Sequence, residues 1–333
     1  MSVLSRTLRR ALPLALSALL ACDGSGAGAT QPAPAQPAEA QPADPAAFEA
    51  ARIRAVHLQD SGGDPREVLD ALLEAHRLNE QHPGINRRLA VLYSDLKLYE
   101  QSLHHFQLLH DAQPDDHEVL LSLITLQVRL GQLDAATADL PPLLTDKELA
   151  GEGRYQQASI LDLQGRRPEA EALVADLSGL TPEQAYRCRS LRGRYEFEKG
   201  DVAAAAADFA GALAGRADYK EALRGAADSA RRLGHEDEAQ HWDEVLELFV
   251  ALTDNVFINT PKAAPQKRAV LEKLVVAYPA WGKGFLELAD LEAKAGDKEA
   301  ACATVRAYLA AHGGELATGD RGKLEQRFCG GGP

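Results

Sequence analysis

The sequence predicts an all-α protein built as a solenoid of stacked helix hairpins, and two observations carry this prediction. Of its 333 residues, 45% are hydrophobic but only 5% are aromatic, so Ala and Leu must fill the interior, which is typical of helices. Five segments also repeat a Gly, a polar helix start and a small residue, with the glycines at positions 131, 165, 200, 234 and 296. Stacked hairpins of about 34 residues produce such a period.

The first 21 residues have the features of a lipoprotein signal peptide. Residues 1–10 contain arginines and no acidic residue, and residues 11–21 form an apolar run that is too short to span a bilayer. The run ends in Leu19-Leu20-Ala21-Cys22, which resembles the lipobox of bacterial lipoproteins. The resemblance implies that Cys22 becomes the lipidated N-terminus and that the protein faces the periplasm from the inner or the outer membrane. An ordinary signal peptide with a nearby cysteine is the alternative.

Residues 22–45 are predicted to form a disordered tether after the lipidated cysteine. They are rich in Pro, Ala, Gly and Gln and hold no large apolar side chain, so they cannot bury enough surface to fold. An extended chain of this length, at about 3 Å per residue, reaches roughly tens of ångströms from the membrane.

The rest of the chain is divided by the repeat. Repeats are predicted over 46–252, an irregular loop over 253–265, a degenerate and a final repeat over 266–314, and a cap helix with a flexible tail over 315–333. The loop is placed where the glycine spacing shortens and turn formers gather, and it is either a repeat defect or a functional loop. A terminal repeat needs a cap because it otherwise exposes an apolar face.

One repeat shows the family pattern most fully. It carries Leu89-Ala90, Tyr93, Ser102, Phe106 and Pro114 at the spacing W-x2-L-G-x2-Y, then A-x3-F, then P. The array therefore resembles the tetratricopeptide repeat (TPR), although no copy fills the Trp position. The resemblance implies antiparallel helix pairs whose first helices line a concave surface that binds protein partners.

Neither an enzyme nor a cofactor is predicted. The sequence has no G-x-S-x-G, Walker A, H-E-x-x-H or C-x-x-C motif, and the repeats leave no room for a separate catalytic domain. His104, His105, His110 and His117 are expected to be surface residues rather than metal ligands. A formal net charge of −13 excludes sequence-independent binding of nucleic acid, because phosphate neutralisation requires clustered Lys and Arg.

The concave groove is placed by carrying the family's groove positions onto this chain. The candidate partner-binding residues are Arg87, Arg129, Tyr155, Arg194, Phe197, Arg224 and Arg231. The groove is more basic than the acidic chain around it, and Arg can bind a carboxylate through two parallel hydrogen bonds, so an acidic or C-terminal peptide segment is one predicted ligand. The alternative is that these arginines pair with acidic residues of neighbouring helices.

The cysteines support one disulfide. With Cys22 lipidated, Cys188, Cys302 and Cys329 remain, and a periplasmic location permits disulfides. We expect a Cys302–Cys329 bridge that holds the cap helix, with Cys188 left as a thiol within a helix.

Together these features predict a non-catalytic, membrane-anchored TPR scaffold or adaptor that binds a protein partner in the bacterial cell envelope, in an assembly or secretion-type role. Lipoproteins of secretin assembly, outer-membrane barrel assembly and peptidoglycan hydrolysis look similar, and no residue selects among them. The alternative is an accessory protein that binds a glycan or small molecule in the groove. Groove aromatics would favour it, and only Tyr155 and Phe197 are candidates.

Overall fold

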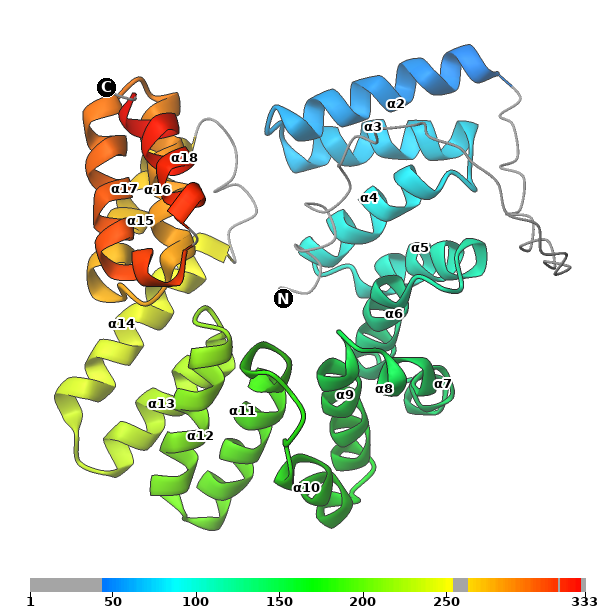
Figure 1. Ribbon diagram of the computed structural model, residues 1–333. Coiled ribbons are helices and arrows are strands. Elements are labelled where there is room, and N and C mark those ends of the chain that lie inside the picture. Colours follow the sequence, from blue (N-terminus) through cyan, green and yellow to red (C-terminus); the bar gives the residue numbers. More distant parts are fainter. Residues whose placement is uncertain (1–43, 254–262, 317, 331–333) are drawn as a thin grey trace, which may run out of the picture. The chain divides into compact units, whose positions relative to one another are not determined.

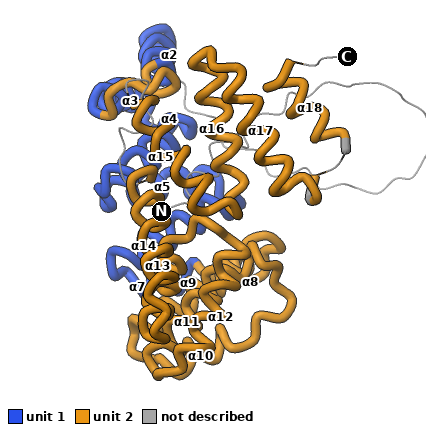
Figure 2. Tube along the Cα trace, turned by 90° about the vertical axis from the view of Figure 1, so that its left-hand side faces the viewer, with its two compact units in different colours: residues 1–57, 66–139 blue, residues 58–65, 140–333 orange. Residues whose placement is uncertain are grey.

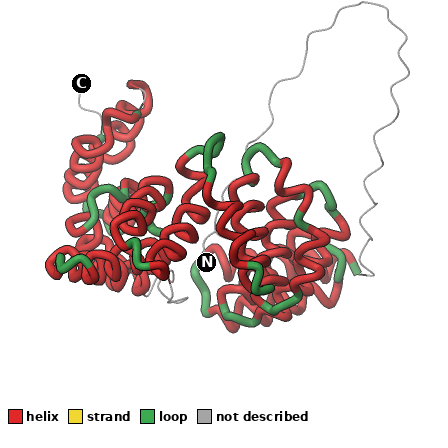
Figure 3. The backbone as a smooth tube through the Cα atoms, turned by 90° about the horizontal axis from the view of Figure 1, so that it is seen from below, coloured by secondary structure: helices red, strands yellow, loops and turns green. Residues whose placement is uncertain are grey.

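The computed structural model describes residues 44–253, 263–316 and 318–330 (Figure 1). The predicted signal peptide, Cys22, most of the predicted tether, most of the predicted loop and the last three residues lie outside this part. Every regular element within it is a helix (Figure 3). The chain divides into two compact units, residues 1–57 with 66–139 and residues 58–65 with 140–333 (Figure 2).

The first unit is a stack of helix pairs. It contains α2 (Pro45–Asp60, whose last residues fall in the second unit), α3 (Pro65–Leu78), α4 (Pro83–Asp95), α5 (Tyr99–Ala112), α6 (His117–Arg129) and α7 (Leu133–Asp139). Helix α5 packs against both α4 and α6, which is the arrangement of a solenoid.

The second unit, described by itself, is also built of stacked helix pairs. It contains α8 (Pro141–Thr145), α9 (Ala150–Leu163), α10 (Arg167–Ala175), α11 (Pro182–Lys199), α12 (Val202–Gly215), α13 (Lys220–Arg232), α14 (Glu236–Thr253), α15 (Ala264–Ala277), α16 (Gly282–Lys294), α17 (Lys298–His312), a 3-10 turn η3 (Gly313–Glu315) and α18 (Thr318–Cys329). Helix α11 packs against α9, α10, α12 and α13. The described residues thus form an all-α, TPR-like solenoid of stacked helix hairpins.

The turn inside each hairpin follows the predicted period. All five repeat glycines have positive φ, between 75° and 89°. In each case the next amide donates to a carbonyl five residues earlier at 2.8–2.9 Å, as Asp201 N does to Glu196 O, which closes the end of the first helix. The series of positive-φ turns extends beyond these five positions, because Gly62, Lys97 and Gly330 also have positive φ, between 61° and 68°. Lys97 is a turn residue that the glycine pattern did not reveal.

The small residue of each hairpin is buried where two helices cross. The residues at this position are between 0% and 2% exposed, and they are Ala71, Ser102, Ala136, Ala170, Ala205, Ala239 and Ala301. Ser102 also donates from its hydroxyl to the Ala90 carbonyl at 2.7 Å, which links α5 to α4. A larger side chain here would force the paired helices apart.

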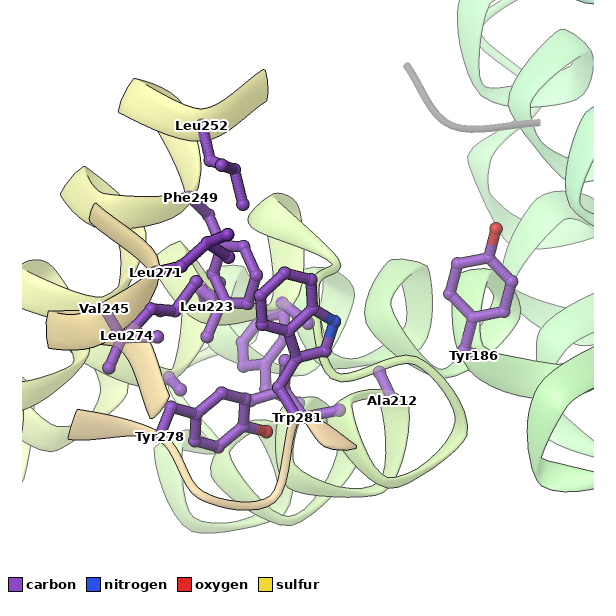
Figure 4. Packing of buried hydrophobic residues seen from close by; sticks show 14 of the residues in the cluster. Tyr186, Ala212, Leu223, Val245, Phe249, Leu252, Leu271, Leu274, Tyr278 and Trp281 are labelled. Carbon is purple, nitrogen blue, oxygen red and sulfur yellow. The ribbon is translucent and has the colours of Figure 1, made fainter. Parts of the chain in front are cut away.

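The degenerate repeat lies between α14 and α16. Helix α15 covers nearly the segment predicted as a helix, 266–278, and it packs against both α14 and α16, while α14 also packs against α13. Phe249 of α14 meets Trp281 edge to face, with ring centroids 4.8 Å apart, and also meets Tyr278 edge to face, at 6.4 Å (Figure 4). Large aromatic side chains therefore fill the contact between α14 and the segment that joins α15 to α16.

The last described helix covers the end of the array. Helix α18 buries Phe328 against Ala289, Ala301 and Val305, with Leu324 alongside. A disulfide joins Cys302 of α17 to Cys329 at the end of α18, and Cys188 is a free, buried thiol. The cap is thus held by both apolar packing and a covalent bond.

Candidate binding pocket

A pocket of about 320 Å³ opens on one side of α9, α11 and α13 in the second unit. Its lining residues are Tyr155, Ser190, Leu191, Arg194, Phe197, Phe209, Tyr219, Glu221, Arg224, Gly225 and Asp228. Four of the seven predicted groove residues are among them: Tyr155, Arg194, Phe197 and Arg224. The volume is at the lower end of the range for ligand pockets.

The repeat explains why these residues meet. Tyr155, Ser190 and Arg224 each lie ten positions before the turn glycine of their own hairpin, so they are equivalent residues on adjacent first helices. Within α13, Glu221, Arg224 and Asp228 are spaced three and four apart, which places them on one helical face. A stack of equivalent faces therefore builds the rim of the pocket.

The floor is aromatic and depends on two glycines. A β-carbon at Gly225 would lie 2.3 Å from the Phe209 ring, and one at Gly193 would lie 3.3 Å from it, so both glycines leave space for this ring between α11 and α13. Tyr219, the residue before α13, meets Tyr186 edge to face at 4.9 Å. Sequence reasoning missed Phe209 and Tyr219 because it took only positions on first helices, and both of these lie outside them.

A buried polar cluster fixes the helices next to the pocket. The Tyr186 hydroxyl donates to a Glu152 oxygen at 3.0 Å and accepts from Arg187 Nε at 3.0 Å and Arg216 Nη1 at 3.3 Å. Arg187 also pairs with Glu152 at 3.0 Å, and both side chains are about one-tenth exposed. Burial lowers the pKa of Arg187, but Glu152 and nearby tyrosines raise it more, so this guanidinium stays charged. The cluster holds α9 and α11 in fixed positions.

Two of the predicted groove arginines in the second unit are neutralised by carboxylates of the chain itself. Arg194 pairs with Asp162 of α9 at 2.7 Å, and Arg231 pairs with Asp243 of α14 at 2.6 Å and with Asp228 at 3.2 Å. This is the alternative in which groove arginines pair with neighbouring helices. The pocket lining holds two arginines and two acidic residues, so the groove is not basic at this point.

Arg224 and Glu221 differ from those paired residues. Both side chains are exposed on α13, one helical turn apart. Within the part of the chain that the structure describes, neither makes a hydrogen bond or an ion pair. They are the charges of the lining that remain available to a ligand.

The other two predicted groove residues belong to the first unit. Arg87 pairs with Asp116 at 2.6 Å, and Arg129 lies over the Tyr99 ring, 4.7 Å from its centroid. Asp116 also accepts from the Val119 amide at 3.0 Å and so caps the N-terminus of α6. Each of these arginines is thus held by neighbours in its own unit.

The histidine segment of the first unit is not simply surface. His105 is 5% exposed, and its Nδ1 lies 2.9 Å from the Asn86 side-chain oxygen. Its ring contacts His76, with centroids 4.9 Å apart, and it stacks on Tyr93 at 5.5 Å. Burial, with a smaller contribution from His76, lowers the pKa of His105 to about 4. The expectation of a surface residue was wrong for His105.

No group of three or more His, Cys, Asp or Glu side chains in the described ranges is arranged to hold a metal ion. Within those same ranges, no helix is long and apolar enough to cross a membrane. The pocket offers a ligand shaped walls and two charges that have no partner among the described residues.

Comparison of the sequence with protein-family models and with curated proteins gives no match. Among solved structures, the chain is similar to one titled Naa15/Naa10 bound to HypK-THB, at 14% identity and a TM-score of 0.37, over 85% of this chain and 56% of that one. It is also similar to the TPR domain of P58(IPK), at 13% identity and a TM-score of 0.31, over 85% of this chain and 98% of that one. Both TM-scores lie below 0.5, so the fold description rests on the helix pairs of the chain itself.

Proposed function

We propose that this protein is a non-catalytic scaffold that binds a protein partner in the pocket between α9, α11 and α13. The observation that carries this proposal is the pocket itself, where an aromatic floor meets two available charges on a solenoid surface. Regularly stacked helices with fixed side chains present a preorganised surface, which lowers the entropic cost of binding an extended segment.

The proposal includes an envelope location. The Leu19–Cys22 segment supports lipidation of Cys22, and the Pro- and Ala-rich segment after it supports a spacer between membrane and repeats. Fractionation of cells expressing the wild type and Cys22→Ala tests this part. We expect the wild type in the membrane fraction and the variant in the soluble fraction, and a soluble wild type would refute the anchor.

Partner binding is tested by affinity capture from solubilised membranes after crosslinking in intact cells. Arg224→Ala should reduce the recovered partner at least tenfold, because it removes an available charge of the pocket. Arg166→Ala is the matched control, since Arg166 lies in the same unit outside the pocket and pairs with Glu169 at 2.6 Å. Equal recovery from both variants would show that the pocket does not bind the partner.

A second candidate function is the binding of a glycan or small molecule. Four aromatic rings line the pocket, from Tyr155, Phe197, Phe209 and Tyr219, which is two more than the sequence indicated. Aromatic faces stack on apolar faces of small ligands. Retention of a purified glycan by the isolated protein, with no crosslinked protein partner, would select this candidate.

A further inference from the structure

The floor of the pocket is suited to one large apolar group. Phe197, Phe209 and Tyr219 present rings to a space of about 320 Å³, and Leu191 adds an aliphatic wall. Removing an apolar side chain from water into such a space is favourable in proportion to the area buried. The volume suits a single side chain rather than the row of anchors that an amphipathic helix presents.

The rim is suited to two opposite charges. Arg224 and Glu221 are exposed, one turn apart on α13, and free of partners within the described residues, whereas Arg194 and Asp228 are already paired with Asp162 and Arg231. A uniformly acidic segment would meet Glu221 and be repelled. A neutral ligand would leave both charges without partners, which is unfavourable once water is displaced.

We propose that the pocket binds an extended peptide segment through one large apolar anchor side chain that is flanked by a basic residue facing Glu221 and an acidic residue facing Arg224. This inference rests on the proposed protein-binding function and names its ligand: a mixed-charge segment rather than an acidic tail. Opposite charges on the rim then fix the direction in which the segment lies, because reversing the peptide would place like charges together.

The direction provides a sharp test. A phage-displayed library of random dodecapeptides is selected against the full chain and against the double variant Glu221→Arg/Arg224→Glu, both purified in detergent. We expect the wild type to enrich peptides with one aromatic or large aliphatic residue between a basic and an acidic residue in a fixed order. The double variant should enrich the opposite order. Both substituted positions are exposed, so folding should be unaffected.

A matched control uses the same exchange elsewhere. Arg166→Glu/Glu169→Arg exchanges an exposed Arg and Glu three positions apart on the second unit, outside the pocket. It should enrich the same motif as the wild type. In a selected peptide, replacing the anchor by Ala should weaken binding at least tenfold.

The outcomes separate this inference from the proposed function. Selected peptides that are uniformly acidic, or whose charge order does not reverse in the double variant, would overturn the inference while leaving peptide binding intact. Failure to enrich any peptide would also overturn it, and crosslinking in intact cells would then decide whether protein binding itself fails. Loss of the motif in the control exchange would show that it is not read by the pocket.

Discussion

Gly151→Ala should destabilise the second unit, although alanine favours helices. Gly151 lies in the first turn of α9, where a β-carbon would lie 2.0 Å from the main-chain oxygen of Gln184 and 2.7 Å from its carbonyl carbon. Both atoms belong to the backbone of α11, so no side-chain rotation can relieve the contact and the helices must separate. Overpacking costs about 1–3 kcal/mol, occasionally more, and helix propensity returns at most about 1 kcal/mol. Because the contact is with backbone, the cost lies at the upper end of that range, at about 3 kcal/mol. After the gain in helix propensity, we expect a net loss of about 2 kcal/mol.

Thermal unfolding followed by circular dichroism measures this loss. For a unit of this size, about 2 kcal/mol lowers Tm by roughly 4–8 °C. Gly322→Ala is the matched control, because Gly322 lies in α18 with no atom within 4 Å of an added β-carbon. The control should be as stable as the wild type or slightly more so. A Gly151→Ala variant with unchanged Tm would refute the close approach of α9 and α11.

Three further predictions concern titratable groups. Burial and the Asp208 carboxylate raise the pKa of Glu196, so the folded protein favours the protonated side chain and loses stability as pH rises and Glu196 ionises. Glu196→Gln should therefore raise the free energy of unfolding at pH 7 by about 1 kcal/mol. In urea titrations this gain should disappear near pH 4. The pKa of His105 is lowered in the folded protein, so the free energy of unfolding should fall as pH drops from about 6.5 toward 4. His105→Gln should make this fall smaller when unfolding is measured as a function of pH. Burial raises the pKa of the Cys188 thiol to about 12. In a chain without Cys22, a thiol reagent should therefore find no reactive thiol in the folded protein and one after denaturation. Three reactive thiols after denaturation would contradict the Cys302–Cys329 disulfide.

The hairpin architecture was predictable because its physical signature is periodic. A positive-φ turn favours glycine, and a helix crossing requires a small side chain, so both leave marks at fixed intervals. Lys97 shows the limit of that signal. It adopts φ 62° at the expected interval, but as a lysine it carries no compositional mark. The turn there is imposed by the surrounding helices rather than encoded by its own residue.

The pocket was predictable only in part. First-helix positions placed Tyr155, Arg194, Phe197 and Arg224 together, since equivalent residues on stacked helices face the same way. The pairs that join different helices could not be read from spacing. Asp162 of α9 reaches Arg194 and Asp243 of α14 reaches Arg231 only in the folded chain, whereas the Arg231–Asp228 pair within α13 has the spacing of helical neighbours. Phe209 lies on the second helix of its hairpin, and its ring reaches the pocket through the space left by Gly193 and Gly225. A prediction that takes groove residues only from first helices does not include it.

Site-specific photo-crosslinking in intact cells tests pocket binding most directly. A photoreactive amino acid is placed at Phe197, which lines the pocket, and separately at Val276 of α15, which is 79% exposed and lies outside it. We predict that position 197 crosslinks to one protein, that position 276 does not, and that Glu221→Arg/Arg224→Glu removes the crosslinked product. The absence of a protein crosslinked at position 197, or the same products from both positions, would contradict binding of a protein partner in this pocket.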